Sequence, residues 1–239
     1  MVYRTSSSIQ ARKDAKRQHL ITVASKVFAA RGYAGTTVKD IVDEAQAAVG
    51  TFYLYFKSKE DIFETLYEEI SELIISAVDQ ATTGADHTLV QRFCRATAAS
   101  LATYQEYRDL TRILLIEAPG LNPRFRQKHL DKLERSRERM ADLFSKLAGK
   151  GLIEVPDVTV AALAFDGTFV NVIMSWLHSG QSQKLTDFTA ALAIYNLQAL
   201  RIPYTNEEVH QFVADYYRNP PRPTAPPSDR SSSKEGEES

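Results

Sequence analysis

Apolar residues recur about every three to four positions through most of this chain, which is the spacing of one face of an α-helix. The pattern predicts a basic first helix that opens at Arg12 and ends at Gly32. Further helices are predicted at residues 38–45, 59–80, 87–105, 107–117, after Pro123, across 158–177 and 185–202, and at 205–218. The predicted fold class is therefore all-α.

The stretch from Thr36 to Lys59 contains two short predicted helices separated by a tight turn. Thr37 is suited to cap the first helix, with Asp40 completing a capping box. In the second helix, Phe52 and Phe56 would share one buried face, which leaves the other face to hydroxyl-bearing residues. The stretch therefore has the outline of a helix-turn-helix.

Residues 50–56 taken alone would also suit a buried strand, because aromatic residues favour strands. Their flanks favour the helix. A basic amphipathic helix precedes them, and Ser58 and Asp61 form another capping box before an apolar run at helical spacing.

Positive charge is concentrated at the start of the chain. Residues 1–59 contain ten Lys and Arg against four Asp and Glu, a net charge of +6, whereas the remainder contains 19 against 26, a net charge of −7. A basic head on an acidic body attracts DNA phosphates to the head alone. The alternative is a solvated basic surface without a partner.

The chain is not expected to be an enzyme, and neither a metal nor a cofactor is expected. The five His are scattered without metal-ligand spacing, and no glycine-rich phosphate loop or nucleophile motif occurs. Cys94 is the only cysteine, which excludes an intramolecular disulfide and suits the reducing cytoplasm.

The first residues are polar and basic, so no signal peptide is expected. The most membrane-like stretch, residues 158–177, contains Asp166, Gly167 and Asn171, which disfavours a membrane span. We expect a cytoplasmic protein with no membrane partner.

From about Arg12 to Glu69 the chain resembles the DNA-binding domain of the TetR family of bacterial transcriptional regulators. The resemblance is carried by Phe28, Gly32, Tyr33, Thr36, Thr37, Ile41, Ala45, Gly50, Thr51, Tyr53, Tyr55, Phe56, Lys59 and Glu60. The family usually has a glycine and a valine in the turn, where this chain has Gln46 and Ala47. Because a Cβ is strained at positive φ, we expect a looser or shifted turn at Gln46.

Composition at the two ends, together with the resemblance, predicts four segments. They are a disordered N-terminal arm at residues 1–11, a helix-turn-helix domain at 12–58, a helical ligand-binding and dimerisation domain at 59–218, and a disordered tail at 219–239. The implied function is a homodimeric repressor that binds a pseudo-palindromic operator and is released by a small molecule. Residues 158–177 and 185–202 match the family's four-helix dimer interface; the alternative is that they are central core helices.

The matching positions and their chemistry predict the DNA contacts. Ala48 and Thr51 suit base edges or a thymine methyl, whereas hydroxyl and ammonium groups suit phosphates. The full predicted set is Thr36, Thr37, Ala47, Ala48, Thr51, Tyr53, Tyr55, Lys57 and Lys59.

The effector site is implied between the middle helices of the larger domain, although residues of each of these types are more often found in a core than in a pocket. The predicted residues are Phe93, Tyr104, Arg112, Ile113, Ile116, Phe165, Phe169 and Trp176. Arg108, Arg112, Arg124 and Arg126 near Pro119 suggest an acidic or phosphate-bearing ligand such as an acyl-CoA, unless they form ion pairs with Glu106, Asp109 and Glu117.

Two other functions are compatible with the same sequence. One is a DNA-binding protein without an effector, dimerised through the same helices. The other is a helical interaction protein whose basic head binds a partner other than DNA.

Overall fold

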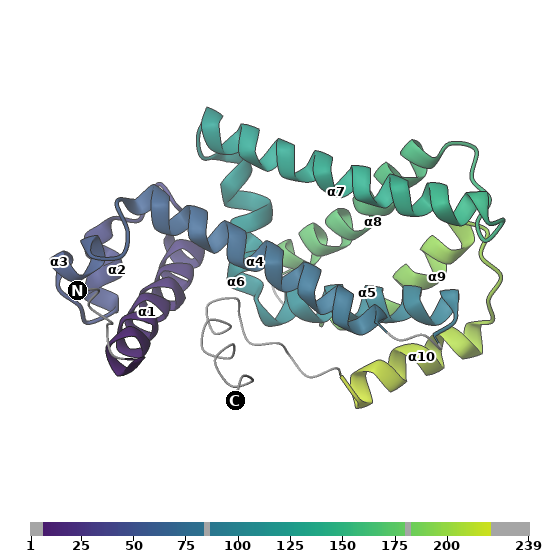
Figure 1. The fold of residues 1–239 in the computed structure, drawn as a ribbon, viewed down its shortest axis with the longest axis horizontal. Helices are drawn as coiled ribbons and strands as arrows, with labels where there is room; N and C mark the ends of the chain where they lie inside the picture. Colours follow the sequence, from purple (N-terminus) through teal and green to yellow (C-terminus); the bar gives the residue numbers. More distant parts are fainter. Residues whose placement is uncertain (1–6, 84–86, 180–182, 221–239) are drawn as a thin grey trace, which may run out of the picture. The chain divides into compact units, whose positions relative to one another are not determined.

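The computed structural model describes residues 7–83, 87–179 and 183–220, which are helical with no strand among them. This confirms the all-α prediction. The first part of the chain forms α1 (Ser7–Arg31), α2 (Val38–Glu44), α3 (Val49–Tyr53) and α4 (Lys59–Thr82). After it come α5 (Leu89–Glu106), α6 (Arg108–Arg112), a π-helical turn η1 (Ile113–Glu117), a 3-10 turn η2 (Ala118–Gly120), α7 (Pro123–Gly149), α8 (Val158–His178), a 3-10 turn η3 (Leu185–Phe188), α9 (Thr189–Ala199) and α10 (Asn206–Arg218) (Figure 1).

The chain divides into two compact units. The described part of the first, called the head below, contains residues 7–72 together with 109–117. The described part of the second, called the body, contains residues 73–108 and 118–220 apart from the undescribed positions. The boundary between the two units falls within α4. The head also includes residues 109–117, which form most of α6 and all of η1.

Local sequence signals determine where several helices begin. The Asn122 side chain accepts a hydrogen bond from the Phe125 N–H at 2.8 Å, with Pro123 in the first turn of α7. Asp157 caps α8 by accepting from the Val160 N–H at 2.9 Å. These caps satisfy helix N–H groups that have no partner inside the helix, so both predicted starts are confirmed.

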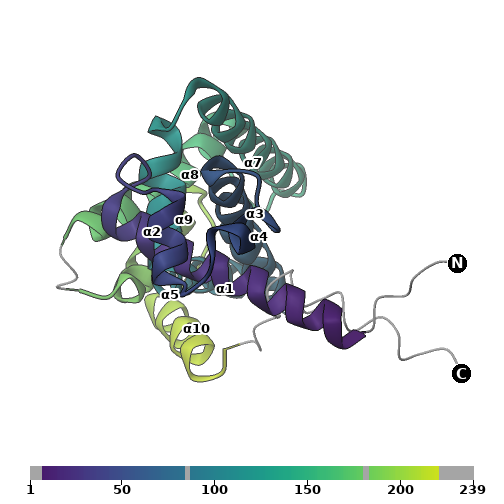
Figure 2. The same cartoon turned by 90° about the vertical axis from the view of Figure 1, so that its left-hand side faces the viewer.

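The head has a small core in which aromatic rings are prominent. Phe28, Phe52, Phe56 and Phe63 are fully buried. The Phe63 ring contacts Phe28 and Tyr33 edge-on, with centroids 5.3 and 5.0 Å apart. This core fixes α3 against the neighbouring helices of the head; Figure 2 shows the ribbons of α1, α2 and α3 from one side.

The body is built around α5, α7, α8, α9 and α10. Phe144 of α7 and Leu197 of α9 are completely buried in its main core, together with Cys94 of α5. Burial raises the pKa of the Cys94 thiol to about 12, so this cysteine is a protonated core residue. The additional helix α10 packs on α5 and α9 through Val209, Val213 and Tyr216.

Several boundaries differ from those expected. Helix α1 begins at Ser7, within the segment expected to be a disordered arm, and residues 1–6 lie outside the described residues. Helix α3 ends at Tyr53, before the expected Phe56. The helix expected at 107–117 is divided into α6 and η1, and most of the expected tail, 221–239, lies outside the described residues.

One face of α8 and α9 is both apolar and uncovered. Val160 and Leu163 of α8 are 60% and 44% exposed, and Tyr195 of α9 is 60% exposed. A groove beside them is lined by Gly167, Asn171, Leu192 and Tyr195, among others. Within the described ranges, α8 is the one helix long and apolar enough to cross a membrane, which is weak evidence of a span.

Candidate nucleic-acid interface

The turn between α2 and α3 is closed by backbone hydrogen bonds. Ala45 ends α2, and the Ala47 N–H reaches back to the Val42 carbonyl at 2.9 Å. Gln46 adopts a left-handed conformation with φ of +50° to make this closure. The expectation of a looser or shifted turn is therefore wrong, because Gln46 accepts the strained φ and the turn is a closed, hydrogen-bonded helix end.

Helix α3 has one buried and one exposed face. Phe52 is fully buried, and Phe56, beyond the helix end, packs beside it with ring centroids 5.6 Å apart. Tyr53 is 56% exposed, and Ala48 and Val49 at the start of the helix are also exposed. The prediction that Phe52 and Phe56 share a packed face is confirmed.

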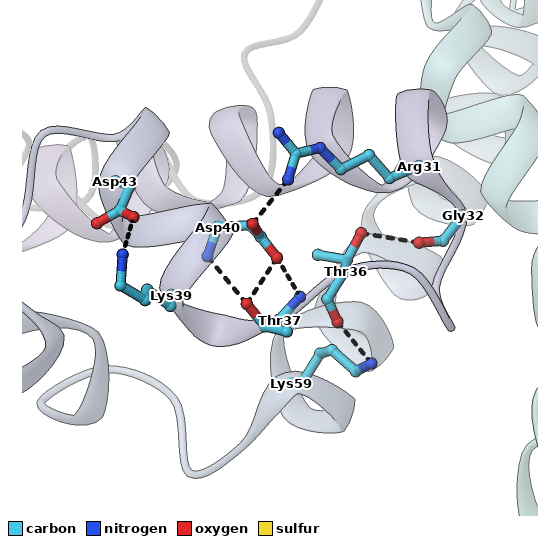
Figure 3. A network of polar contacts seen from close by, with 8 residues as sticks. All are labelled: Arg31, Gly32, Thr36, Thr37, Lys39, Asp40, Asp43 and Lys59. Atoms are coloured by element: carbon cyan, nitrogen blue, oxygen red, sulfur yellow. Dashed lines mark hydrogen bonds and ion pairs between the residues drawn. The ribbon is translucent and has the colours of Figure 1, made fainter.

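Thr37 organises the start of α2 (Figure 3). Its hydroxyl oxygen accepts from the Asp40 N–H at 3.1 Å, and the Asp40 carboxylate accepts from the Thr37 N–H at 2.8 Å and from its hydroxyl at 2.6 Å. Arg31 pairs with the same carboxylate at 2.7 Å. The Thr37 hydrogen bonds, the largest cause, and the neighbouring Arg31 hold the pKa of Asp40 below its usual value.

Lys59, the first residue of α4, holds the loop between α1 and α2. Its ammonium donates to the Tyr33 and Thr36 carbonyls at 2.8 and 2.7 Å and lies 4.0 Å from the centroid of the Tyr33 ring. A half-buried ammonium with these partners stabilises the fold. Any contact between Lys59 and a DNA phosphate would use the same ammonium group that already donates to these two carbonyls.

The structure separates the other expected DNA residues by exposure. Thr36 is 1% exposed, and its hydroxyl donates to the Gly32 carbonyl at 2.7 Å, so its side chain belongs to the core and has no surface for DNA. Thr37, Ala48, Tyr53 and Lys57 are exposed, whereas Ala47, Thr51 and Tyr55 are half-buried.

A helix N-terminus such as that of α4 has N–H groups that suit a phosphate. In this chain, the Asp61 carboxylate accepts from the Lys57 N–H at 2.7 Å, and the Ser58 hydroxyl accepts from the Asp61 N–H at 3.3 Å. The predicted Ser58 cap is confirmed, but the predicted capping box would need Asp61 to accept from the Ser58 N–H, and its carboxylate accepts from the Lys57 N–H. A carboxylate of the chain therefore already occupies this position.

Tyr33 connects three parts of the head. Its hydroxyl donates to Glu60 Oε1 at 2.6 Å, and its backbone N–H donates to Glu117 Oε2 at 3.3 Å. The Tyr33 hydrogen bond lowers the pKa of Glu60. Glu117 ends η1 and also lies 3.9 Å from Arg112 Nε, so the η1 segment contacts the loop that Lys59 holds.

The eight expected effector residues divide between the two units. Arg112, Ile113 and Ile116 belong to the head, where Ile113 is fully buried, and the other five belong to the body. The structure brings three of those five together. The Phe165 ring lies 6.1 Å from Phe93 and 5.1 Å from Phe169, measured between centroids.

The remaining two serve the body in other ways. Trp176 is 5% exposed and donates its indole N–H to the Gln183 carbonyl at 3.1 Å, with the Arg108 guanidinium 5.5 Å from its ring centroid. Burial, and secondarily the charge of Asp166, raise the pKa of Tyr104 well above its ordinary range. Arg124 and Arg126 are exposed on the first turn of α7.

Sequence reasoning missed a set of polar groups between α7 and α8. Burial raises the pKa of Asp166, and Arg137 partly opposes that shift. Burial and two neighbouring cations, Lys132 and Arg137, lower the pKa of His129. The Nε of Arg137 is buried without a hydrogen-bond partner. Asp166 was visible in the sequence as a charge within an apolar segment, but its neighbour on α7 was not.

Among the described residues, no group of three or more His, Cys, Asp or Glu side chains could hold a metal ion.

The role of Lys59 predicts a specific loss of stability. Lys59→Met removes both carbonyl hydrogen bonds while keeping the aliphatic stem, and should lower the free energy of unfolding by about 2–3 kcal/mol. Urea unfolding followed by circular dichroism measures it. Lys57→Met is the matched control, because Lys57 is exposed, and should change stability by less than about 0.5 kcal/mol. Equal losses of stability in the two variants would contradict a stabilising role for the Lys59 hydrogen bonds.

Comparisons with known proteins agree with this geometry. Residues 20–66 match the profile described as bacterial regulatory proteins, tetR family, and residues 86–198 match the tetracyclin repressor-like C-terminal domain. The chain is 31% identical over 96 residues to the HTH-type transcriptional regulator HbdR of Aromatoleum sp. (strain CIB), covering 40% of this chain and 42% of that protein. Against the first curated relatives, it spans 35–50% of their length.

Two further similarities extend through the body. The fatty acid metabolism regulator protein of Bacillus subtilis (strain 168) is 26% identical over 174 residues, or 72% of this chain and 89% of that protein. The structure of the transcriptional regulator FadR from Bacillus subtilis in complex with stearoyl-CoA has a TM-score of 0.66 at 22% identity, covering 76% of this chain and 98% of that one. With an N-terminal and a C-terminal profile of one family matched in order, this chain belongs to the TetR family of bacterial transcriptional regulators.

Proposed function

We propose that this chain is a cytoplasmic, homodimeric repressor that binds a pseudo-palindromic DNA operator and is released from it by a fatty acyl-CoA. The observation that carries the DNA-binding part is α3. Its buried side is fixed by Phe52, while Ala48, Val49 and Tyr53 present an exposed surface at and near its N-terminal end. In a helix-turn-helix, the N-terminal residues of the second helix reach base edges in the major groove.

The exposed residues around α3 divide the contacts by chemistry. Ala48 and the half-buried Thr51 suit a thymine methyl or a base edge, whereas Tyr53, Tyr55 and Lys57 suit phosphates. Two heads related by a two-fold axis would read half-sites about 34–36 Å apart. The charge of the first 59 residues, +6, suits this task, and affinity should fall steeply with salt.

The DNA-binding proposal predicts the effect of losing Tyr53. In a mobility-shift titration with the duplex upstream of its own gene, Tyr53→Ala should weaken binding about tenfold, because a phosphate contact is lost in each head. Leu130→Ala, an equally exposed position on α7, is the control and should bind like wild type. The titration is repeated at two salt concentrations with an unrelated duplex as competitor. If the unrelated duplex displaces the wild-type protein at both, the operator proposal is rejected.

The uncovered face of α8 and α9 supports the homodimer. Val160, Leu163 and Tyr195 are large apolar or aromatic side chains left in water, and a contiguous patch of this kind marks an interface. The neighbouring groove has a mostly apolar lining that includes Gly167, whose position leaves open space where a Cβ would lie. A second copy of the same face would cover both features.

The dimer proposal predicts sensitivity to charge on this face. Leu163→Glu should convert the dimer to a monomer in sedimentation-velocity runs at micromolar concentration, because a desolvated carboxylate opposes association. Leu143→Glu is the matched control. Leu143 lies on α7 with 45% of its surface exposed, close to the 44% of Leu163, and its variant should stay dimeric. Dimers in both variants would place the interface elsewhere.

Three observations support the acyl-CoA effector. The chain resembles in fold a regulator whose structure holds stearoyl-CoA. The body contains an aromatic cluster of Phe93, Phe144, Phe165 and Phe169, and Arg137 has a buried Nε without a partner, as an anionic or carbonyl group would require. A ligand can release DNA only by binding the non-operator state more tightly.

The head contains a segment through which such a signal could act. Arg112 lies near Glu117, and Glu117 accepts from the Tyr33 N–H in the loop held by Lys59. A change at Arg112 would therefore alter the partners that Glu117 has within the head.

The effector proposal predicts a separation of two properties. Arg112→Ala should leave operator affinity unchanged while raising the stearoyl-CoA concentration that releases half of the DNA by about tenfold, since a charge-assisted contact is lost. Fluorescence anisotropy with labelled operator measures both. Arg139→Ala, an exposed arginine on α7, should respond like wild type. If Arg112→Ala is released normally, Arg112 is not part of the effector response.

A further inference from the structure

Two non-glycine residues of the described chain have positive φ, Gln46 at +50° and Arg201 at +54°. Both follow the end of a helix, where a left-handed residue closes the backbone. Gly32 and Gly151 adopt the same left-handed conformation, with φ of +70° and +66°. A side chain at such a position is unfavourable, so its presence calls for a reason.

The structure supplies that reason for Arg201. Its guanidinium pairs with the Glu154 carboxylate at 2.6 Å, and the Glu154 N–H donates to the Leu200 carbonyl at 3.1 Å beside it. The side chain at this left-handed position therefore joins the end of α9 to the loop before α8.

The Gln46 side chain has no contact inside the fold equivalent to the ion pair of Arg201. Its side chain is exposed, and its carboxamide makes no hydrogen bond with any described residue. The turn itself is closed by main-chain bonds, from the Gln46 N–H to the Asp43 carbonyl at 3.2 Å and from the Ala47 N–H to the Val42 carbonyl at 2.9 Å. Glycine would make these bonds without strain.

The place of Gln46 points to DNA. It lies in the turn two residues before Ala48, the exposed N-cap of α3, in the element proposed to enter the major groove. The last turn of α2 carries two carboxylates, Asp43, which Lys39 pairs at 2.5 Å, and the exposed Glu44. A cation in this turn would be drawn to Glu44, whereas a neutral carboxamide keeps its N–H donors for another partner.

We propose that the Gln46 carboxamide donates a hydrogen bond to an operator phosphate next to the groove that α3 occupies. This inference rests on the proposed operator binding. Amide side chains commonly contact phosphates, and such contacts set the register of the protein on the duplex without reading sequence. Gln46 thereby fixes how α3 enters the groove, at the cost of a strained turn.

Two substitutions separate the side chain from the strain. Gln46→Ala keeps the Cβ and the strained φ but removes the carboxamide, whereas Gln46→Gly removes both. Each should weaken binding about fivefold for every head on the DNA, equally on operator and on unrelated duplex. Gln46→Gly alone should raise the melting temperature, by about 2–4 °C. Fluorescence anisotropy and thermal unfolding of the full chain measure these effects.

The controls distinguish this contact from its alternatives. Because Gln46 is uncharged, the dependence of affinity on salt should match wild type in both variants. Arg139→Ala, at an exposed arginine of α7, should leave DNA affinity unchanged.

Wild-type affinity in both Gln46 variants would overturn the proposal, and a loss confined to the operator would replace the phosphate with a base edge and overturn it too. Absence of specific binding by wild type would instead reject the operator function itself.

Discussion

The position of the helix-turn-helix depends on the ammonium of Lys59. The loop between α1 and α2 turns the chain without a helix to satisfy its carbonyl groups, and Lys59 donates to two of them, on Tyr33 and Thr36. Thr36 is held at both ends, because its buried hydroxyl also donates to the Gly32 carbonyl. The next residue, Thr37, is therefore placed where its side chain caps α2 (Figure 3). The start of α2 in turn places α3, because the turn at Gln46 is short and closed by main-chain bonds.

The sequence predicted those features that depend on neighbouring residues. The caps at Thr37, Asn122 and Asp157 each join a side chain to a backbone group a few positions away, so spacing alone reveals them. The roles of Lys59 and Thr36 could not be read in this way. An ammonium and a hydroxyl suit phosphates and carbonyls equally well, and the carbonyls that Lys59 contacts lie 26 and 23 residues away. Only the folded loop shows which partner is available, so fewer residues remain in the proposed DNA-contact set than the chemistry alone suggested.

The π-helical turn η1 shows the same limit over a greater sequence distance. The apolar pattern predicted one helix at 107–117. Instead, α6 is followed by the wider turn η1, which ends at Glu117. That carboxylate accepts a hydrogen bond from Tyr33, 84 residues earlier in the chain. A π-helical turn inserts an extra residue into a helix and is often found at functional sites. Arg112 at the end of α6 and Ile113 and Ile116 within η1 belong to the head, so the expected effector residues divide between the two units.

Helix α8 illustrates how exposure favours one of several interpretations that composition leaves open, here the proposed interface. An apolar helix of its length suits a membrane span, a central core or an interface between copies. A central core helix would have its large side chains covered, yet Val160 and Leu163 are 60% and 44% exposed. A lipid-facing helix would keep charge from its middle, yet α8 carries Asp166, which Arg137 of α7 partly neutralises, and the exposed Asn171 lies on the groove. Apolar side chains mixed with amide and small residues beside a groove are the composition of a protein interface, in which polar groups are tolerated because a second polypeptide supplies their partners.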